Sequence, residues 1–363
     1  MSRPASLVAA ASVAAAAAAL AVPSSAGAVF HGTPVPASET PWLVSFLARD
    51  VACGGALIAP NRVLTAAHCV QGVRPGRLRV RLGGGELGAT RLVGWKGAVF
   101  PSSYRSVPSP LAPEDPLKAS TVDDVAVVVL DRPVTDVPVV PLAVDAPAPG
   151  EPALTVGRGR TGPAPAGLDP EATDPGRPSH VALGAAQVVE TGAACGAAYG
   201  SALRAADHLC TIDRSGVGAQ ACGGDSGSPV LVRGASGWAV AGVVAWGGEV
   251  RGRDCGEGLP DVSERVAPHA TLLAARALPA AFAPWAERRV RVRRVAGGKL
   301  RCVIGTWGPG EASFSVAWWR AGKRRTPVSG TTAVRADRPG RLGCTVTART
   351  AGGWAEELSY NAL

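Results

Sequence analysis

The segment 222–229, with the sequence CGGDSGSP, decides how the rest of this 363-residue chain is interpreted. A serine hydroxyl such as that of Ser226 is a poor nucleophile at neutral pH and needs a base beside it. The flanking glycines let the backbone turn sharply and can point N–H groups at a developing negative charge. A Gly-Asp-Ser-Gly tetrapeptide also occurs in ordinary turns, so the segment needs partners elsewhere in the chain.

Two upstream segments supply the groups that such a serine requires. Residues 64–69 (LTAAHC) contain His68, which can accept a proton, and residues 123–130 (DDVAVVVL) begin with two aspartates. A buried carboxylate fixes the tautomer of the histidine and stabilises its imidazolium form. The alternative, that His68 is a core histidine and Ser226 a turn residue, leaves three such segments in one chain unexplained.

The chain around these segments has an all-β pattern up to about residue 275. Short Val, Leu and Ala runs alternate with Gly, Pro and Asp turns, which is typical of sandwiches and barrels. The expected strands are Leu43–Leu47, Gly55–Ile58, Arg77–Leu82, Val125–Leu130, Ser228–Val232 and Ala239–Ala245. About 250 residues with this pattern would fill a pair of packed barrels.

In the chain order His, Asp, Ser, the three segments resemble those of the chymotrypsin-like (trypsin-family) serine proteases, over Val29 to about Ala275. The resemblance implies an all-β fold of two packed six-stranded β-barrels. It also implies an endopeptidase that forms an acyl-enzyme and needs no cofactor and no metal. We therefore expect protein or peptide substrates.

The resemblance also assigns the catalytic roles. His68 would be the base, Asp124 the orienting acid and Ser226 the nucleophile, and the N–H groups of Gly224 and Ser226 would form the oxyanion hole. Asp123 competes for the acid role. Asp124 is preferred because it directly precedes the apolar strand, as the aspartate of the family does.

The eight cysteines match disulfides of the family and of the C-terminal region. A metal site is a poor alternative, because the cysteines of the larger region form no Cys-x-x-Cys pair and the adjacent His68 already has a role. The expected pairs are Cys53–Cys69, Cys195–Cys210, Cys222–Cys255 and Cys302–Cys344.

Substrate binding is expected along two segments. In trypsin-like relatives an aspartate six residues before the nucleophile lies at the base of the specificity pocket, and that position is Gln220 here, followed by Ala221. The Ser-Trp-Gly strand of the family is Ala245-Trp246-Gly247, so a serine that hydrogen-bonds the catalytic aspartate in relatives is missing. None of these differences removes a catalytic group.

Asp261 replaces a glycine on the opposite side of the same pocket, in the segment Pro260-Asp261-Val262-Ser263. A carboxylate there, beside Gln220, predicts a modest preference for Lys or Arg on the acyl side of the cleaved bond. The alternative is that the long loop 246–255 shifts this alignment, so that Asp261 faces solvent or pairs with Arg253.

Residues 1–28 predict a secretory signal peptide. The run 7–22 is apolar and mostly Ala, and Ala26-Gly27-Ala28 is a small-x-small cleavage signal. A membrane anchor is the alternative, but the run is shorter than the roughly 20 strongly apolar residues that a span needs. We expect a secreted, extracellular protein without a membrane span.

Val29 directly follows this signal, and Val29-Phe30-His31-Gly32 resembles the Ile-Val-Gly-Gly start of mature relatives. In the family the new N-terminal amine pairs with the aspartate just before the catalytic serine, which is Asp225 here. We therefore expect a Val29–Asp225 ion pair that signal cleavage itself makes possible. The alternative is cleavage after Ala26, which leaves a short propeptide.

The last fifth of the chain differs in charge and pattern. Residues 287–363 contain 15 Lys and Arg against 5 Asp and Glu, a net charge of +10, and follow the Ala/Pro-rich residues 277–286. Cys302, Trp318 and Cys344 resemble the disulfide and tryptophan of an immunoglobulin-like sandwich. The sequence therefore predicts a trypsin-like domain over 29–276, a linker over 277–286 and a small basic immunoglobulin-like β-sandwich over 287–363.

The basic domain has two interpretations. It could contact the cell wall or a polyanion such as teichoic acid, polysaccharide or nucleic acid, or its arginines could simply keep the domain soluble. The rival function for the whole chain is a catalytically weak or silent binding protein on a protease scaffold, acting through this domain. The intact serine, histidine and aspartate segments argue against the rival, and we expect a monomeric enzyme.

Overall fold

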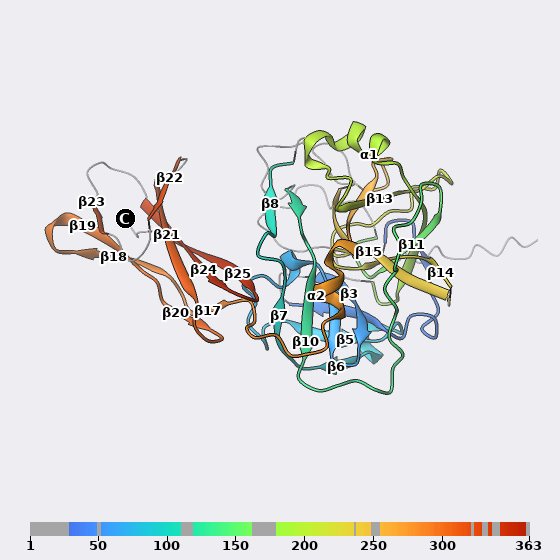
Figure 1. The fold of residues 1–363 in the computed structure, drawn as a ribbon, viewed down its shortest axis with the longest axis horizontal. Helices are drawn as coiled ribbons and strands as arrows, with labels where there is room; N and C mark the ends of the chain where they lie inside the picture. The colour runs from blue at the N-terminus through green and yellow to red at the C-terminus, as the bar shows by residue number, and fades with distance from the viewer. Residues whose placement is uncertain are drawn as a thin grey trace, which may run out of the picture.

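The computed structural model describes residues 29–48, 52–109, 119–161, 179–235, 237–247, 255–320, 323–328, 333–335 and 342–360. The described chain is mostly β-structure, with two short α-helices, α1 (Gly192–Tyr199) and α2 (Ala270–Ala274). Two sheets form a larger body, and the C-terminal strands lie beside it (Figure 1). No helix in the described ranges is long and apolar enough to cross a membrane. The expected signal peptide, 1–28, lies outside them.

The second half of the larger body is a closed six-stranded barrel. Its strands are β11 (Pro152–Gly157), β12 (Leu183–Val189), β13 (His208–Ile212), β14 (Pro229–Gly234), β15 (Gly237–Gly247) and β16 (Asp261–Arg265). The order β12-β11-β14-β15-β16-β13 closes because β13 also pairs with β12, and β1 (Thr33–Pro34) adds to β12. Closure removes the exposed sheet edge, and buried side chains such as Leu209 and Val230 fill the interior.

The first half is a seven-stranded sheet that forms a half-barrel, so the structure shows one closed six-stranded barrel and a half-barrel where the sequence predicts two packed six-stranded barrels. Its strands are β2 (Leu43–Leu47), β3 (Ala52–Ala59), β4 (Arg62–Thr65), β5 (Arg79–Leu82), β6 (Arg91–Val93), β7 (Trp95–Val99) and β10 (Ala126–Leu130). The order is β6-β5-β2-β3-β4-β10-β7. The strands β6 and β7 are separated only by Gly94, so this one stretch of chain bends there and pairs with β5 through β6 and with β10 through β7.

Arg158 joins the two halves. It follows β11 and is 4% exposed, and its guanidinium donates to the carbonyls of Gly83 and Gly85 in the first half and of His180 in the second. Burial lowers the pKa of Arg158 to about 10. The halves are therefore held by a buried cation on backbone carbonyls as well as by a shared apolar core.

The C-terminal region consists of three small sheets. Its strands are β17 (Trp285–Arg288), β18 (Arg291–Val295), β19 (Lys299–Val303), β20 (Thr306–Gly308), β21 (Ser313–Arg320), β22 (Lys323–Val328), β23 (Ala333–Arg335), β24 (Leu342–Thr350) and β25 (Gly353–Tyr360). The sheets have the orders β17-β20, β18-β19-β23 and β22-β21-β24-β25. A disulfide between Cys302 and Cys344 joins β19 to β24, and Trp318 is buried in the same core. The immunoglobulin-like classification stays a prediction.

The C-terminal region packs against the edge of the half-barrel, next to β7 (Figure 1). In the segment expected to be a linker, Ala283 donates its N–H to β7 at 2.8 Å. At the turn between β24 and β25, the Gly352 carbonyl accepts the N–H of Phe100 at 3.0 Å. The indole N–H of Trp354 donates to the carbonyl of Tyr104 at 3.0 Å. At Ala283, the segment 277–286 therefore packs against the protease and is not a free linker.

Candidate active site

His68 and Asp124 come from the half-barrel and lie within hydrogen-bond distance of each other. His68 lies in a 3₁₀ turn (Ala67–Cys69) after β4, and Asp124 directly precedes β10, which pairs with β4. The Nδ1 atom of His68 lies 2.6 Å from Oδ2 of Asp124, and the His68 backbone N–H donates to Oδ1 at 2.9 Å. Asp124 is fully buried. The carboxylate of Asp123 lies instead 4.0 Å from Nε2 of His269.

These contacts shift the pKa values of both groups. Burial alone would lower the pKa of His68, but the charge of Asp124 and its hydrogen bond more than offset this, so the pKa is raised. Burial alone would raise the pKa of Asp124, but His68 and the hydrogen bonds hold it lowered. The pair can therefore hold a proton on the ring while the acid stays ionised, as general-base chemistry requires.

Ser226 lies in the second half, on the loop before β14. Its carbonyl accepts the N–H of Gly54 at 2.7 Å, and the N–H of Gly227 donates to Val244 at 2.8 Å, so both halves fix this loop. Gly224 has φ +95°, which favours glycine. Among the described residues the N–H groups of Gly224 and Ser226 have no protein acceptor. Both are available to a developing oxyanion.

One cleft of about 400 Å³ brings His68 and Ser226 to a common space. On the first-half side it is also lined by Ser106 of β8 (Arg105–Val107) and Thr121 of β9 (Ser120–Val122). Five residues expected to bind substrate line it as well: Ala221, Ala245, Trp246, Gly247 and Asp261. The cleft therefore joins a histidine–carboxylate pair, a serine and a buried acid.

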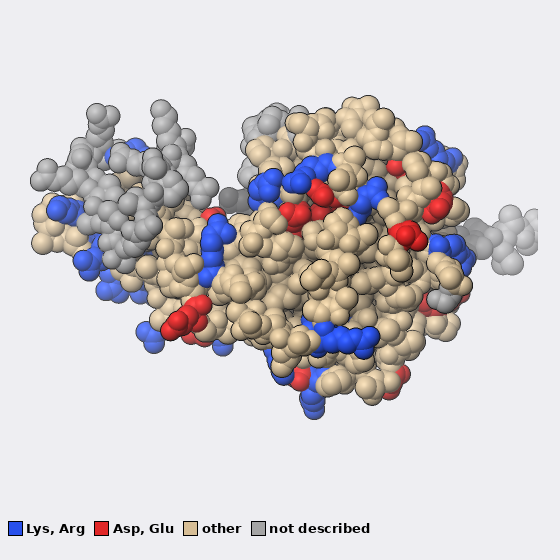
Figure 2. Space-filling model, in the orientation of Figure 1, with Lys and Arg blue, Asp and Glu red and all other residues tan. Residues whose placement is uncertain are grey.

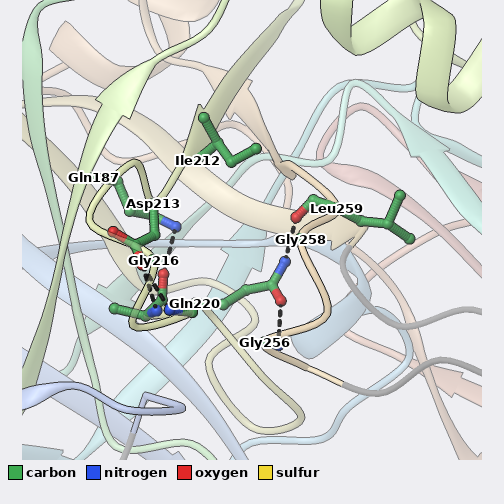
Figure 3. A pocket seen from close by; sticks show the side chains of 10 residues that line it. Gln187, Ile212, Asp213, Gly216, Gln220, Gly256, Gly258 and Leu259 are labelled. Atoms are coloured by element: carbon green, nitrogen blue, oxygen red, sulfur yellow. Dashed lines mark hydrogen bonds between the residues drawn. The ribbon is translucent and has the colours of Figure 1, made fainter.

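Gln220 does not line this cleft. Its side chain borders a neighbouring cavity of about 170 Å³. Its Nε2 donates to the Leu259 carbonyl at 2.6 Å, and its Oε1 accepts the N–H of Gly256 at 2.6 Å (Figure 3). Since both ends of the amide bind backbone, Gln220 forms part of the wall behind the specificity pocket. A family alignment gives the position of the residue but not the direction of its side chain.

Asp261 lies in β16 and is 2% exposed. Its Oδ2 accepts Nε2 of Gln187 at 2.7 Å and the N–H of Ala221 at 3.0 Å. Burial raises the pKa of Asp261 to about 6, although hydrogen bonds from Gln187, Ala221 and Gln220 act in the opposite direction. At neutral pH the cleft therefore contains a carboxylate that has no Lys or Arg ion-pair partner among the described residues.

Asp225 and Val29 are both buried. The Oδ1 atom of Asp225 accepts the N–H of Gly159 at 2.7 Å, and its Oδ2 accepts the N–H of Cys222 at 3.0 Å. Val29 packs in a small apolar cluster with Leu183, Ala185 and Ala219. An amine carried by Val29 would therefore lie in the interior.

Glu264 is a residue of the site that sequence reasoning missed. Its Oε2 accepts the N–H of Asp124 at 3.2 Å, and its Oε1 lies 3.1 Å from Nε2 of His269. Glu264 is fully buried in β16, and burial raises its pKa. Asp123, Glu264 and His269 have ligand atoms within 4.8 Å and could hold a cation, but Glu264 and His269 already bind each other. No local signal marks a glutamate within a strand as a support for a distant aspartate.

Four disulfides join the cysteines in the expected pairs. They are Cys53–Cys69, Cys195–Cys210, Cys222–Cys255 and Cys302–Cys344. The first ties β3 to the turn that carries His68, and the third ties the Ser226 loop to the start of the segment that leads to Asp261. These links fix the site against the barrels.

The fold and the site define a chymotrypsin-like serine protease. A family model described as Trypsin matches residues 29–273. Trypsin alpha of Drosophila erecta is 27% identical over 231 residues, which are 62% of this chain and 80% of that protein. Hypodermin-A of Hypoderma lineatum is 28% identical over 228 residues, 61% of this chain and 78% of that protein. A solved structure described as neuropsin, a serine protease expressed in the limbic system of mouse brain, matches the fold with a TM-score of 0.53 and 22% identity, over 68% of this chain and 98% of that one.

Because the family model covers more than half of the chain, this protein belongs to the trypsin family. The class is therefore a serine-protease hydrolase, which implies protein substrates. The C-terminal region lies outside the matched residues.

Proposed function

We propose that this chain is a secreted serine endopeptidase. Ser226 attacks a peptide carbonyl while His68 takes the serine proton and then gives it to the leaving amine. Water, activated by the same ring, hydrolyses the acyl-enzyme, releases the peptide acid and restores the serine. Asp124 orients His68 and stabilises its charged form, and the N–H groups of Gly224 and Ser226 stabilise the oxyanion. The observation that carries the proposal is the 2.6 Å contact of buried Asp124 with His68 in the cleft that Ser226 shares.

Labelling with a fluorophosphonate tests the nucleophile. The purified mature protein should form one covalent adduct, and mass spectrometry of its peptides should place that adduct on Ser226. Ser226→Ala should form none. An unlabelled parent protein would instead support the rival function, a silent protease scaffold that binds a partner through its C-terminal region.

Activation is proposed to need no second protease. Signal cleavage after residue 28 would free the amine of Val29, which would pair with Asp225 in the interior and set the oxyanion loop. The burial of both residues supports this proposal. N-terminal sequencing of the active protein should find Val29 as the first residue, and a stable, fully active form that begins at Gly27 would contradict it.

The acyl-side preference is proposed to be for Lys and Arg, with some large apolar residues accepted. The support is Asp261, a buried carboxylate on the wall of the cleft that can offer charge-assisted hydrogen bonds. We would compare kcat/KM for Arg, Lys, Phe and Leu substrates between the parent protein and Asp261→Gly. The parent should favour the basic substrates several-fold, and the variant should lose that preference. Equal ratios in both proteins would refute the assignment.

The C-terminal region, proposed as an immunoglobulin-like domain over 287–363, is proposed to bind a phosphate-rich polyanion. Arg293 of β18 lies directly opposite Arg301 of β19, and both are exposed. Like charges directly opposite are destabilising, which a bound polyanion would relieve. Lys and Arg side chains gather on this side of the region (Figure 2).

Binding to a polyphosphate matrix tests this proposal. The double variant Arg293→Glu/Arg301→Glu should elute at much lower salt than the parent protein. The matched control is Arg77→Glu/Arg79→Glu, which changes the same charge on the half-barrel and should elute closer to the parent. Equal elution of the two variants would mean that net charge alone is measured, and that the C-terminal arginines only keep the protein soluble.

A further inference from the structure

Gln187 is a buried amide inside the closed barrel. It lies in β12, is 5% exposed and has every polar atom engaged. Its Oε1 accepts the hydroxyls of Thr155 at 3.1 Å and Thr211 at 2.9 Å. Its Nε2 donates to Oδ2 of Asp261 at 2.7 Å and to the carbonyl of Ala219 at 3.2 Å. A buried amide is costly unless such bonds satisfy it, so this network is a specific arrangement.

The orientation of the amide follows from its partners. Asp261 and the Ala219 carbonyl offer only acceptors on one side, so the NH₂ group must face them. A turned amide would place its oxygen against a carboxylate and a carbonyl. The threonine hydroxyls on the other side then donate to Oε1 and hold the orientation. Gln187 therefore presents a fixed donor to the Asp261 carboxylate.

Gln187 stands between two spaces. It borders the cavity behind the specificity pocket, together with Gln220 (Figure 3), whereas Asp261 lines the substrate cleft. A change at Gln187 would therefore act on the cleft through Asp261 and would not touch a substrate directly.

We propose that Gln187 is a positioning residue for substrate specificity, which keeps the Asp261 carboxylate ionised and aimed at the guanidinium or ammonium group of a basic substrate. This inference rests on the proposed preference for Lys and Arg. It identifies Gln187 as the group that determines the pH range over which the preference for Lys and Arg operates. Without the amide donor, a carboxylate in this apolar barrel would take up a proton more readily and would favour neutral side chains.

Among the described residues, hydrogen bonds and not charged neighbours determine whether the Asp261 carboxyl group is ionised. The facing residues are Thr211 on β13, Gly247 on β15 and Ala221 on the loop before Ser226, none of which is titratable. Asp213 borders the cavity behind, where the N–H groups of Gly218 and Ala219 bind its carboxylate. No Lys, Arg or His of the described residues forms an ion pair with Asp261. The pKa of Asp261, about 6, is thus set by burial against hydrogen bonds from Gln187, Ala221 and Gln220.

The test compares Gln187→Leu with the parent protein. kcat/KM is measured for an Arg and a Leu substrate of otherwise identical sequence between pH 5.5 and 9.5, with active sites counted by fluorophosphonate titration. In the parent the Arg/Leu ratio should rise with pH as Asp261 ionises. In Gln187→Leu the rise should move up by about one pH unit, so the ratio should fall about twofold near pH 7 and by nearly tenfold near pH 5.5, the lower end of the range. kcat/KM for the Leu substrate should change much less than that for the Arg substrate.

Ser263→Ala is the matched control, because Ser263 is buried on the same strand as Asp261 and its hydroxyl has no hydrogen-bond partner in the described chain. It should leave the pH profile in place. Gln187→Met, which keeps the length of the side chain, is the second variant if Gln187→Leu does not fold. If the folded variant shows the same dependence of the Arg/Leu ratio on pH as the parent protein, the inference is wrong. If Asp261→Gly also leaves the ratio unchanged, the proposed Lys/Arg preference itself fails.

Discussion

Trp354 should help to hold the C-terminal region against the protease, and Trp354→Ala should weaken this docking. The indole donates a hydrogen bond to the Tyr104 carbonyl at 3.0 Å, and the two rings stack with centroids 5.9 Å apart. Losing the hydrogen bond costs about 1 kcal/mol. Losing the half-buried ring contact costs about 1–2 kcal/mol more. We therefore expect the docking free energy to fall by about 2–3 kcal/mol, which lowers the docked-to-undocked ratio by roughly 30- to 150-fold.

Limited proteolysis measures this change. In a Ser226→Ala background, which prevents self-cleavage, added trypsin should cut after the exposed Arg276 faster in Trp354→Ala than in the parent. Trp319→Ala is the matched control, because the Trp319 ring packs on Tyr360 within the C-terminal region, 4.4 Å between centroids. Equal cleavage rates for all three proteins would refute the reasoning, since the region would then be held by other contacts or not held at all.

Three further predictions concern the site and its supports. Asp225→Asn should lower kcat/KM tenfold or more, because a buried ammonium would lose its partner; a parental rate would contradict the activation ion pair. The acid limb of kcat/KM against pH should have its midpoint above 6.5, because only neutral His68 accepts the serine proton and the pKa of His68 is raised. Asp124→Asn should move this limb to lower pH and cut kcat by about 10⁴-fold. If the limb does not move, the assignment of Asp124 is wrong. Removing the disulfide of Cys302 and Cys344, 42 residues apart, should destabilise the C-terminal region by about 4 kcal/mol in chemical denaturation while peptide hydrolysis continues; loss of hydrolysis under native conditions would show that the protease depends on this region.

The strands and the catalytic segments could be predicted from the sequence because their signals are local. Each expected strand of the two halves lies in or overlaps a strand of the structure. The His68 and Ser226 segments combine chemistry with fixed neighbours, so their assembly in one cleft followed from three short stretches. The disulfide pairs followed from the family resemblance and not from spacing alone.

The remaining features depend on contacts between distant residues. The chain bends at Gly94, so that β6 pairs with β5 and β7 pairs with β10, and a strand pattern does not reveal these pairings. Gln187 and Glu264 each lie in an ordinary strand and gain their roles from partners 74 and 140 residues away. Gln220 occupies the expected backbone position, but its side chain points to the neighbouring cavity because two backbone groups bind its amide.

Arg158 gives the joint between the two halves an unusual response to solution conditions. An ion pair across such a joint would weaken as salt screens it and would break when pH neutralises its acid. The hydrogen-bond partners of Arg158 are backbone carbonyls, which carry no titratable proton and no net charge for salt to screen. With a pKa of about 10 the guanidinium keeps its charge through neutral and mildly alkaline solution. The contribution of Arg158 to the spacing of His68 and Ser226, which lie in the two halves, should therefore depend little on salt or acid; strong alkali should remove its charge and weaken the joint, while the shared apolar core still holds the halves together.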